Sequence, residues 1–183
     1  MEDAELAVCA QAGDREAFGQ LVSRYAGQAR RVARAVLGNP EDADDAAQDG
    51  FLSALTHLAR YDPGRPFGPW LMRIVANAAA DRRRRRRVRA AEELSPTVAA
   101  RTPGPDEVTD QVAFHGALAA ALAALPERQR VAVVLFDVEG YRHAEVAQVL
   151  GVPEGTVRSD VFHARRALRA ALAAWRNWKQ EAV

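Results

Sequence analysis

The sequence predicts an all-α protein with two small helical domains joined by a flexible linker, the C-terminal one containing a helix-turn-helix. Apolar residues recur at helical rather than alternating spacing in both halves of the 183-residue chain. Residues 91–110, which contain three prolines and several acidic residues, separate domains at 1–90 and 111–183. Residues 140–168 combine a short helix, a turn and a longer basic helix.

Composition narrows the class of protein. The hydrophobic share of 49% is enough for two small cores, and the aromatic share of 7% suits helical packing. The N-terminus opens with acidic residues, and no long apolar run follows, so we expect a cytoplasmic protein that does not insert into membranes. Cys9 is the only cysteine, and the histidines lack ligand spacing. We therefore expect no metal, no cofactor and no enzymatic activity, because no nucleophile stands beside a base.

Two helices are predicted in the first sixty residues. Asp14 is a suitable N-cap, and Gly38, Asn39 and Pro40 end the apolar stripe of the first helix. That stripe comprises Phe18, Leu21, Val22, Tyr25, Ala29, Val32 and Val36. The second helix, 41–59, is predicted to turn Ala47, Phe51, Ala54, Leu55 and Leu58 inward.

The opposite side of the 41–59 helix carries a polar stripe with one exposed leucine. The stripe comprises Asp45, Gln48, Asp49 and Leu52, at helical spacing. A solvated acidic face is the plain alternative to a docking surface. A calcium loop fits poorly, because the mid-loop glycine and closing glutamate are missing.

An aromatic loop and a run of six arginines follow. Residues 60–70 are rich in proline and glycine and include Tyr61, Phe67 and Trp70. The next helix is predicted to present Arg73, Asn77 and Asp81 before it reaches Arg82 to Arg87. Such a run alone is usually solvated or contacts phosphate nonspecifically. Beside aromatic rings it favours a single-stranded nucleic acid, because arginines follow the backbone while bases stack on rings.

Charge is segregated along the chain, although the net charge is only +1. Residues 61–91 hold nine Arg against two Asp, and residues 128–183 also carry an excess of basic side chains. Residues 1–60 and 92–127 are acidic. Two basic surfaces therefore suit phosphate, and the acidic ones need another partner or solvent.

The C-terminal window has the spacing of a DNA-reading motif. Val146, Leu150 and Val157 form the predicted apolar hub, with Ala147 and Gly151 where closely crossing helices leave little room. Upstream, Pro126 starts a helix with Val131, Val134, Leu135 and Val138 on one side, and Gly140 ends it. The outward side chains of the second helix are Arg158, Ser159, Phe162, His163, Arg165 and Arg166. They suit base edges and phosphates in a major groove, although a plain αα-hairpin would share the apolar spacing.

Four ordered motifs make the chain resemble an extracytoplasmic-function sigma factor of the sigma-70 family. They read DDAAQDGFLSAL, PFGPWLMRIVANAAADRRRR, LPERQRVAVVL and EVAQVLGVPEGTVRS. The resemblance implies an alternative sigma factor that binds core RNA polymerase, directs it to specific promoters and assists their opening. It implies contacts with the clamp helices of the largest subunit and with the flap, with duplex and single-stranded promoter DNA, and with an anti-sigma factor.

The resemblance assigns a role to each predicted surface. Docking on the polymerase is assigned to Asp45, Gln48, Asp49 and Leu52. Minus-ten recognition is assigned to Tyr61, Asp62, Phe67, Arg73, Asn77, Arg82, Arg83 and Arg84. Minus-35 recognition is assigned to Arg158, Ser159, Phe162, His163, Arg165 and Arg166. A one-domain repressor would explain only the last set.

Three positions leave alternatives open. Asp160 stands where relatives often carry a basic residue; it either accepts a hydrogen bond from a base or pairs within its helix with Arg158 or Arg165. Arg142 replaces the usual Ser or Thr cap, so its helix is predicted to begin loosely. Trp175 and Trp178 either pack on the C-terminal domain or help to bind an anti-sigma partner.

Overall fold

The computed structural model describes residues 1–39, 42–92 and 110–181, without the side chains of 90–92, 110 and 174–181. The helices are α1 (Asp3–Gln11), α2 (Arg15–Leu37), α3 (Ala43–His57), α4 (Phe67–Glu92), α5 (Asp110–Ala124), α6 (Glu127–Val133), α7 (His143–Leu150) and α8 (Glu154–Glu181). A 3₁₀ turn, η1 (Leu58–Arg60), follows α3, and a π-helical turn, η2 (Val134–Val138), follows α6. These described segments contain no β-strand, which confirms the all-α prediction.

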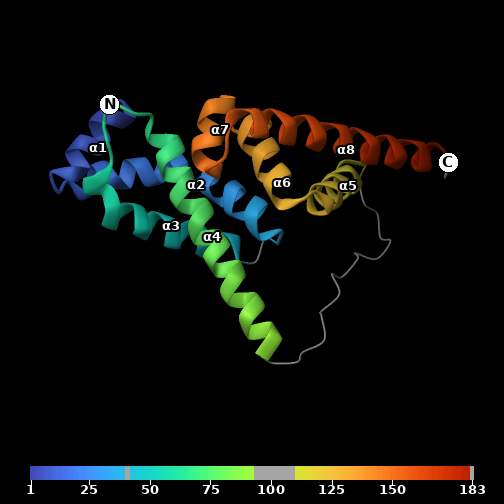
Figure 1. Ribbon diagram of the computed structural model, residues 1–183, viewed down its shortest axis with the longest axis horizontal. Helices are drawn as coiled ribbons and strands as arrows, with labels where there is room; N and C mark the ends of the chain where they lie inside the picture. The colour runs from blue at the N-terminus through green and yellow to red at the C-terminus, as the bar shows by residue number, and fades with distance from the viewer. Residues whose placement is uncertain (40–41, 93–109, 182–183) are drawn as a thin grey trace.

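The helices form two modules that pack against each other. Helices α1–α4 make up the N-terminal module and α5–α8 the C-terminal one; α7 lies against α4 and α6 against α2 (Figure 1). The C-terminal half of α4 runs past the rest of its module. Because α4 continues to Glu92 and α5 begins at Asp110, most of the predicted linker lies outside the described residues.

Local signals in the sequence fix several helix ends. The Asp14 carboxylate accepts hydrogen bonds from the backbone N–H groups of Glu16 and Ala17 at 2.9 and 3.1 Å, as expected of an N-cap. Gly140 has a φ angle of +74°, which confirms its predicted left-handed helix end, and Gly38, where α2 was predicted to end, is also left-handed with φ of +78°. Gly151 also has a positive φ, +66°, but no atom would lie within 4 Å of a Cβ there. The backbone angle, rather than the predicted close helix crossing, therefore favours glycine.

The two modules share most of their hydrophobic core. Buried residues of both modules form one continuous cluster that runs from Leu6 and Leu21 through Leu71 to Leu135 and Val146. A small second cluster, formed by Leu125, Val133 and Ala164, lies between α6 and α8. The modules meet through apolar side chains, so contact between them removes nonpolar surface from water.

Two of the predicted inward residues face solvent. Leu55 is 49% exposed and Val138 is 61% exposed. The π-helical turn explains Val138, because an i→i+5 turn rotates the following side chains away from the α-helical register. The same turn places Glu139 against α2, where its carboxylate accepts hydrogen bonds from Arg31 Nε at 2.5 Å and Nη2 at 2.9 Å.

Gly50 allows α3 and α4 to approach closely. A Cβ on Gly50 would lie 2.8 Å from Val75 Cγ2 and 3.0 Å from the Val75 Cα. We expect Gly50→Ala to lower the free energy of unfolding by about 1–3 kcal/mol, because backbone cannot yield as a side chain can. Each kcal/mol should lower the melting temperature by roughly 2–4 °C in a thermal melt.

Gly19 in α2 is the matched control for that prediction. No atom would lie within 4 Å of its Cβ, so Gly19→Ala should raise the free energy of unfolding by about 0.5–1 kcal/mol through helix propensity alone. Equal effects of the two alanines would contradict the close packing of α3 on α4.

Candidate nucleic-acid interfaces

The outer side of α8 forms the first candidate interface, here called the duplex face. Its six predicted residues are all exposed, namely Arg158, Ser159, Phe162, His163, Arg165 and Arg166. A groove of about 440 Å³ is lined by four of them, Arg158, Phe162, Arg165 and Arg166, together with His143, Val161 and Arg169. Arg169 was missed in the sequence, although it stands three and four residues beyond two predicted arginines and so shares their side of the helix.

Neighbouring side chains hold two arginines of the duplex face in place. The Arg158 guanidinium donates to Glu154 Oε1 at 2.6 and 3.1 Å. Arg165 donates to both Asp137 oxygens and lies 5.2 Å from the centre of the Phe136 ring. Both side chains are therefore oriented before any ligand binds, which reduces the rotamer entropy lost on binding.

Asp160 lies beneath the duplex face and supports it. Only 4% of the residue is exposed, and its carboxylate accepts hydrogen bonds from Arg128 Nε at 2.5 Å and Nη2 at 3.3 Å. This hydrogen bond raises the pKa of Arg128. Both predicted alternatives for Asp160 are therefore wrong, because its partner is on α6 and its oxygens do not face the groove. The ion pair fixes α8 on α6.

Helix α7 begins more firmly than its sequence predicts. The Glu145 carboxylate accepts a hydrogen bond from the Arg142 backbone N–H at 2.7 Å.

The apolar hub of the helix-turn-helix differs from its prediction at one position. Val146 and Val157 are fully buried, whereas Leu150 is half-buried and Val149 takes part in the hub. The helix-turn-helix therefore has a rigid base beneath its exposed arginines.

The polar stripe on α3, from here on called the acidic stripe, is exposed as predicted. Asp45, Gln48, Asp49 and Leu52 all face solvent, and Leu52 is 57% exposed. Leu52 and Gln48 also border an apolar groove of about 350 Å³ between α2 and α3, which Phe18, Val22 and Phe51 line. An exposed leucine next to an apolar groove on an acidic helix has the composition of a protein-binding surface.

The aromatic loop is more buried than its predicted role requires. Tyr61 and Phe67 are only 4% and 3% exposed, and their rings pack at 5.2 Å with Trp70 and Tyr25 beside them. The Tyr61 hydroxyl donates to the Arg65 carbonyl at 2.5 Å. Neither ring has an open face for a base in this arrangement, so their contact with DNA stays a prediction. Asp62 is exposed and orders the loop by accepting from the Gly64 N–H.

A groove between α3 and α4 is the second candidate interface, here called the strand groove. It has a volume of about 670 Å³ and contains the predicted Arg73 and Asn77. Its other lining residues include Arg60, Trp70, Arg82 and Arg85. Half-buried Trp70 offers the aromatic surface that the loop does not. Cations around one ring suit an unpaired strand, because phosphates need cations and every base can stack.

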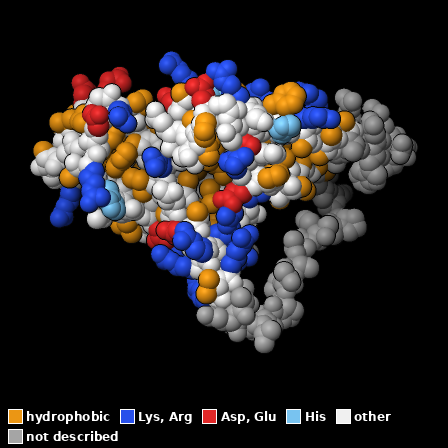
Figure 2. Space-filling model, viewed as in Figure 1, with side chains coloured by type: hydrophobic (Ala, Val, Ile, Leu, Met, Phe, Trp, Pro, Cys, Tyr) orange, Lys and Arg blue, Asp and Glu red, His pale blue; other side chains and the backbone are white. Residues whose placement is uncertain are grey.

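Several arginines of the run are already paired within the chain. Arg82 reaches the acidic stripe, and Arg84 contacts Asp81 at 2.5 Å. Arg83 donates to Glu127 of the C-terminal module and to the Val36 carbonyl. Lys and Arg side chains gather over the projecting part of α4 (Figure 2). The run is therefore a partly neutralised surface, rather than the freely available phosphate contact expected of six consecutive arginines.

Three other predictions from the sequence concern the C-terminal tryptophans, metal binding and membrane insertion. The side chains of Trp175 and Trp178 lie outside the described residues. Among the residues with described positions, no group of three or more His, Cys, Asp or Glu could hold a metal ion. No helix in the described ranges is long and apolar enough to cross a membrane.

The fold and these surfaces define a class of protein. It is an all-α chain with an exposed, arginine-rich helix-turn-helix in one module, and a groove lined by arginines beside an acidic stripe in the other. Two family models match it, Sigma-70 region 2 over residues 21–89 and Sigma-70 region 4 over residues 115–168. The chain is 42% identical over 170 residues to the ECF RNA polymerase sigma factor SigM of Mycobacterium tuberculosis, covering 93% of this chain and 84% of that protein. It belongs to the sigma-70 family, among the ECF sigma factors.

Solved structures agree with that assignment. CnrH in complex with the cytosolic domain of CnrY matches with a TM-score of 0.70 and 33% identity, covering 94% of this chain and 97% of that one. RpoE in complex with the anti-sigma factor NepR from Bartonella quintana matches with a TM-score of 0.67 and 25% identity, covering 85% and 96%. RNA polymerase sigma factor CnrH of Cupriavidus metallidurans is 38% identical over 185 residues, 94% of this chain and 96% of that protein.

Proposed function

We propose that this chain is an alternative sigma factor that binds core RNA polymerase, directs it to specific promoters and assists their opening. The observation that carries the proposal is the presence, in one chain of the sigma-70 family, of a duplex face, a strand groove and an acidic stripe with an exposed leucine. As in other sigma factors, these surfaces bind and position, and no chemical step is assigned to the chain.

Each surface receives one role. The stripe, with Leu52 as its apolar anchor, docks on the clamp helices of the largest polymerase subunit, and the C-terminal module contacts the flap. The duplex face reads the minus-35 element. The strand groove holds the nontemplate strand of the minus-ten element through Arg73, Asn77 and Trp70. Melting costs about 1.4 kcal/mol per base-pair step, so this small groove captures separated DNA while the polymerase supplies most of the opening.

Transcription from a genomic fragment library tests the proposal. Core polymerase is assayed with and without the full chain, and the 5′ ends of the transcripts are mapped. We expect discrete new start sites that depend on the chain. Tight binding to duplex fragments by the chain alone, with no new start sites, would instead favour a repressor.

Arg166 provides a sharp test of the duplex face. It is exposed on α8 and faces the groove, so Arg166→Ala should lose one contact to a base or phosphate. A bidentate base contact is worth about 1–3 kcal/mol, so promoter-duplex affinity of the holoenzyme should fall by about 5-fold to 150-fold. Exposed Arg15 on α2 is the charge-matched control, and Arg15→Ala should change affinity little. Equal losses would mean that only net charge matters.

We further propose a cytoplasmic location and control by an anti-sigma factor. Two of the similar solved structures hold a sigma factor with a separate partner, the cytosolic domain of CnrY in one and NepR in the other. Coexpression of this chain with a candidate anti-sigma protein should suppress its new start sites. If the two C-terminal tryptophans take part, a chain truncated after Leu172 should no longer form that complex.

A further inference from the structure

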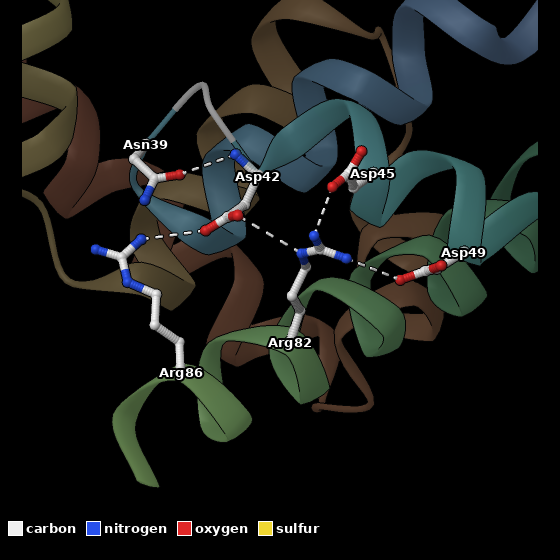
Figure 3. A network of polar contacts seen from close by, with 6 residues as sticks. All are labelled: Asn39, Asp42, Asp45, Asp49, Arg82 and Arg86. Carbon is white, nitrogen blue, oxygen red and sulfur yellow. Dashed lines mark hydrogen bonds and ion pairs between the residues drawn. The ribbon is translucent and has the colours of Figure 1, made fainter. Parts of the chain in front are cut away.

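Arg82 connects the acidic stripe to the strand groove. Its Nη2 lies 2.6 Å from Asp45 Oδ2, and its Nη1 lies 3.2 Å from Asp49 Oδ2 (Figure 3). Its Nε lies 3.7 Å from Asp42 Oδ1, and Asp42 also contacts Arg86 at 3.1 Å. One guanidinium from α4 therefore contacts two carboxylates of α3 and that of Asp42, the residue just before this helix.

The side chain of Arg82 also borders the strand groove. Arg82 and Asp49 both line that groove, next to Arg73, Asn77 and Arg85. Only 30% of the Arg82 side chain is exposed, whereas those of Asp45 and Asp49 are 61% and 51% exposed. The carboxylates can thus accept a second cation from outside, while the guanidinium stays on the inner side, close to where a strand would pass.

Within the described part of the chain, no other arginine of the run pairs with Asp45 or Asp49. Arg83 pairs with Glu127 of the other module, and Arg84 pairs with Asp81 of its own helix. Arg86 reaches the helix only through Asp42, at its N-terminal end. Arg82 alone contacts Asp45 and Asp49, the two carboxylates assigned to polymerase docking.

We propose that Arg82 couples polymerase docking to strand binding, an inference that rests on the proposed function. In the free chain, Asp45 and Asp49 hold the guanidinium and also repel a nearby phosphate. A basic partner surface that pairs with these carboxylates releases Arg82, which then binds a phosphate of the strand in the groove. Because coupling is reciprocal, a bound strand also exposes the carboxylates to the polymerase.

The first test needs no polymerase. An oligothymidylate strand is titrated into the full chain at several salt concentrations, and the slope of log affinity against log salt is measured. The Asp45→Asn, Asp49→Asn double variant should bind more tightly at low salt, because its Arg82 is free. One added phosphate contact should steepen the slope by about 0.7, the value per contact for single strands.

Two controls separate a released arginine from a general change of charge. In an Arg82→Gln background, the two asparagine substitutions should leave the slope unchanged. Glu16→Gln with Asp44→Asn removes two charges outside the contacts of Arg82, and should not steepen the slope in either background. A steeper slope that persists with Arg82→Gln, or no steepening at all, would overturn the proposal.

A second test adds core polymerase. For each chain, the affinity for the strand is measured with and without core, and the ratio of the two affinities is taken. This ratio should be about five times larger or more for the natural chain than for Arg82→Gln, which is within the usual range of coupling between sites. Equal factors would overturn the coupling. If the chain fails to bind core, the proposed function fails, whereas the polymerase-free slopes still decide whether Arg82 is held by the stripe. If the asparagine substitutions leave the salt slope unchanged but the natural chain still directs new start sites, the coupling is wrong and the proposed function stands.

Discussion

The double variant Asp49→Arg, Leu52→Ala is expected to lose all chain-dependent start sites while keeping its fold. Leu52 is 57% exposed and the Asp49 side chain is 51% exposed, so neither substitution removes a core contact, and Asp49→Arg breaks only a half-exposed ion pair with Arg82. At a protein interface, however, a central apolar anchor is worth about 2 kcal/mol or more, and a like charge facing a basic partner opposes docking. We expect Leu52→Ala alone to weaken binding to core about 30-fold, as measured by competition with labelled natural chain.

Val8 on α1 is the control for the loss of exposed apolar surface. It is 48% exposed and lies outside the stripe, so Val8→Ala should bind core normally. Thermal melts of all variants should coincide within a few degrees. Wild-type start sites from a well-folded double variant would rule out α3 as the docking surface, and would leave the acidic stripe as a solvated face.

Features determined by neighbouring residues could be predicted from the sequence. The Asp14 side chain caps α2 by accepting hydrogen bonds from the backbone N–H groups two and three residues later. Gly38 ends the same helix with a left-handed backbone angle. Helical periodicity also placed the duplex face and the polar stripe on exposed sides. These predictions depend on contacts within one or two turns of a helix, so no knowledge of the tertiary fold was needed.

Features determined by distant residues could not be predicted. The partner of Asp160 is Arg128, 32 positions earlier, and the partners of Arg82 are 33 and 37 positions earlier. Periodicity shows which side of a helix faces inward but not which helix lies there. The π-helical turn was missed for another reason: it shifts the register inside an apolar segment that reads as a regular helix, and so exposes Val138.

The contact between the two modules includes one buried carboxylate, that of Glu139, and we expect that reversing its charge opens the molecule. The Glu139 side chain is 4% exposed, and it accepts hydrogen bonds from Arg31 and, at 3.1 Å, from Gln28 Nε2. Gln28 also accepts a hydrogen bond from the Tyr141 hydroxyl at 2.7 Å. Burial raises the pKa of Tyr141, so this hydroxyl stays a donor throughout the neutral range.

Glu139→Arg places a cation against Arg31 and removes the acceptor of three hydrogen bonds. Truncating one member of a buried charged pair costs about 2–5 kcal/mol, and we expect the lower end because the Arg31 side chain is 52% exposed. The modules should therefore separate while each keeps its helices. Small-angle scattering should show a larger radius of gyration with an unchanged helical circular dichroism spectrum.

A charge swap distinguishes a broken pair from general damage. Adding Arg31→Glu to Glu139→Arg restores opposite charges across the contact and should restore much of the compact form. Glu16→Arg makes the same charge change at an exposed position of α2 and should leave the radius unchanged. A compact Glu139→Arg variant would mean that the apolar contact of α7 with α4 holds the modules together without the ion pair. The distance between the duplex face and the strand groove would then be set by packing alone, independently of salt.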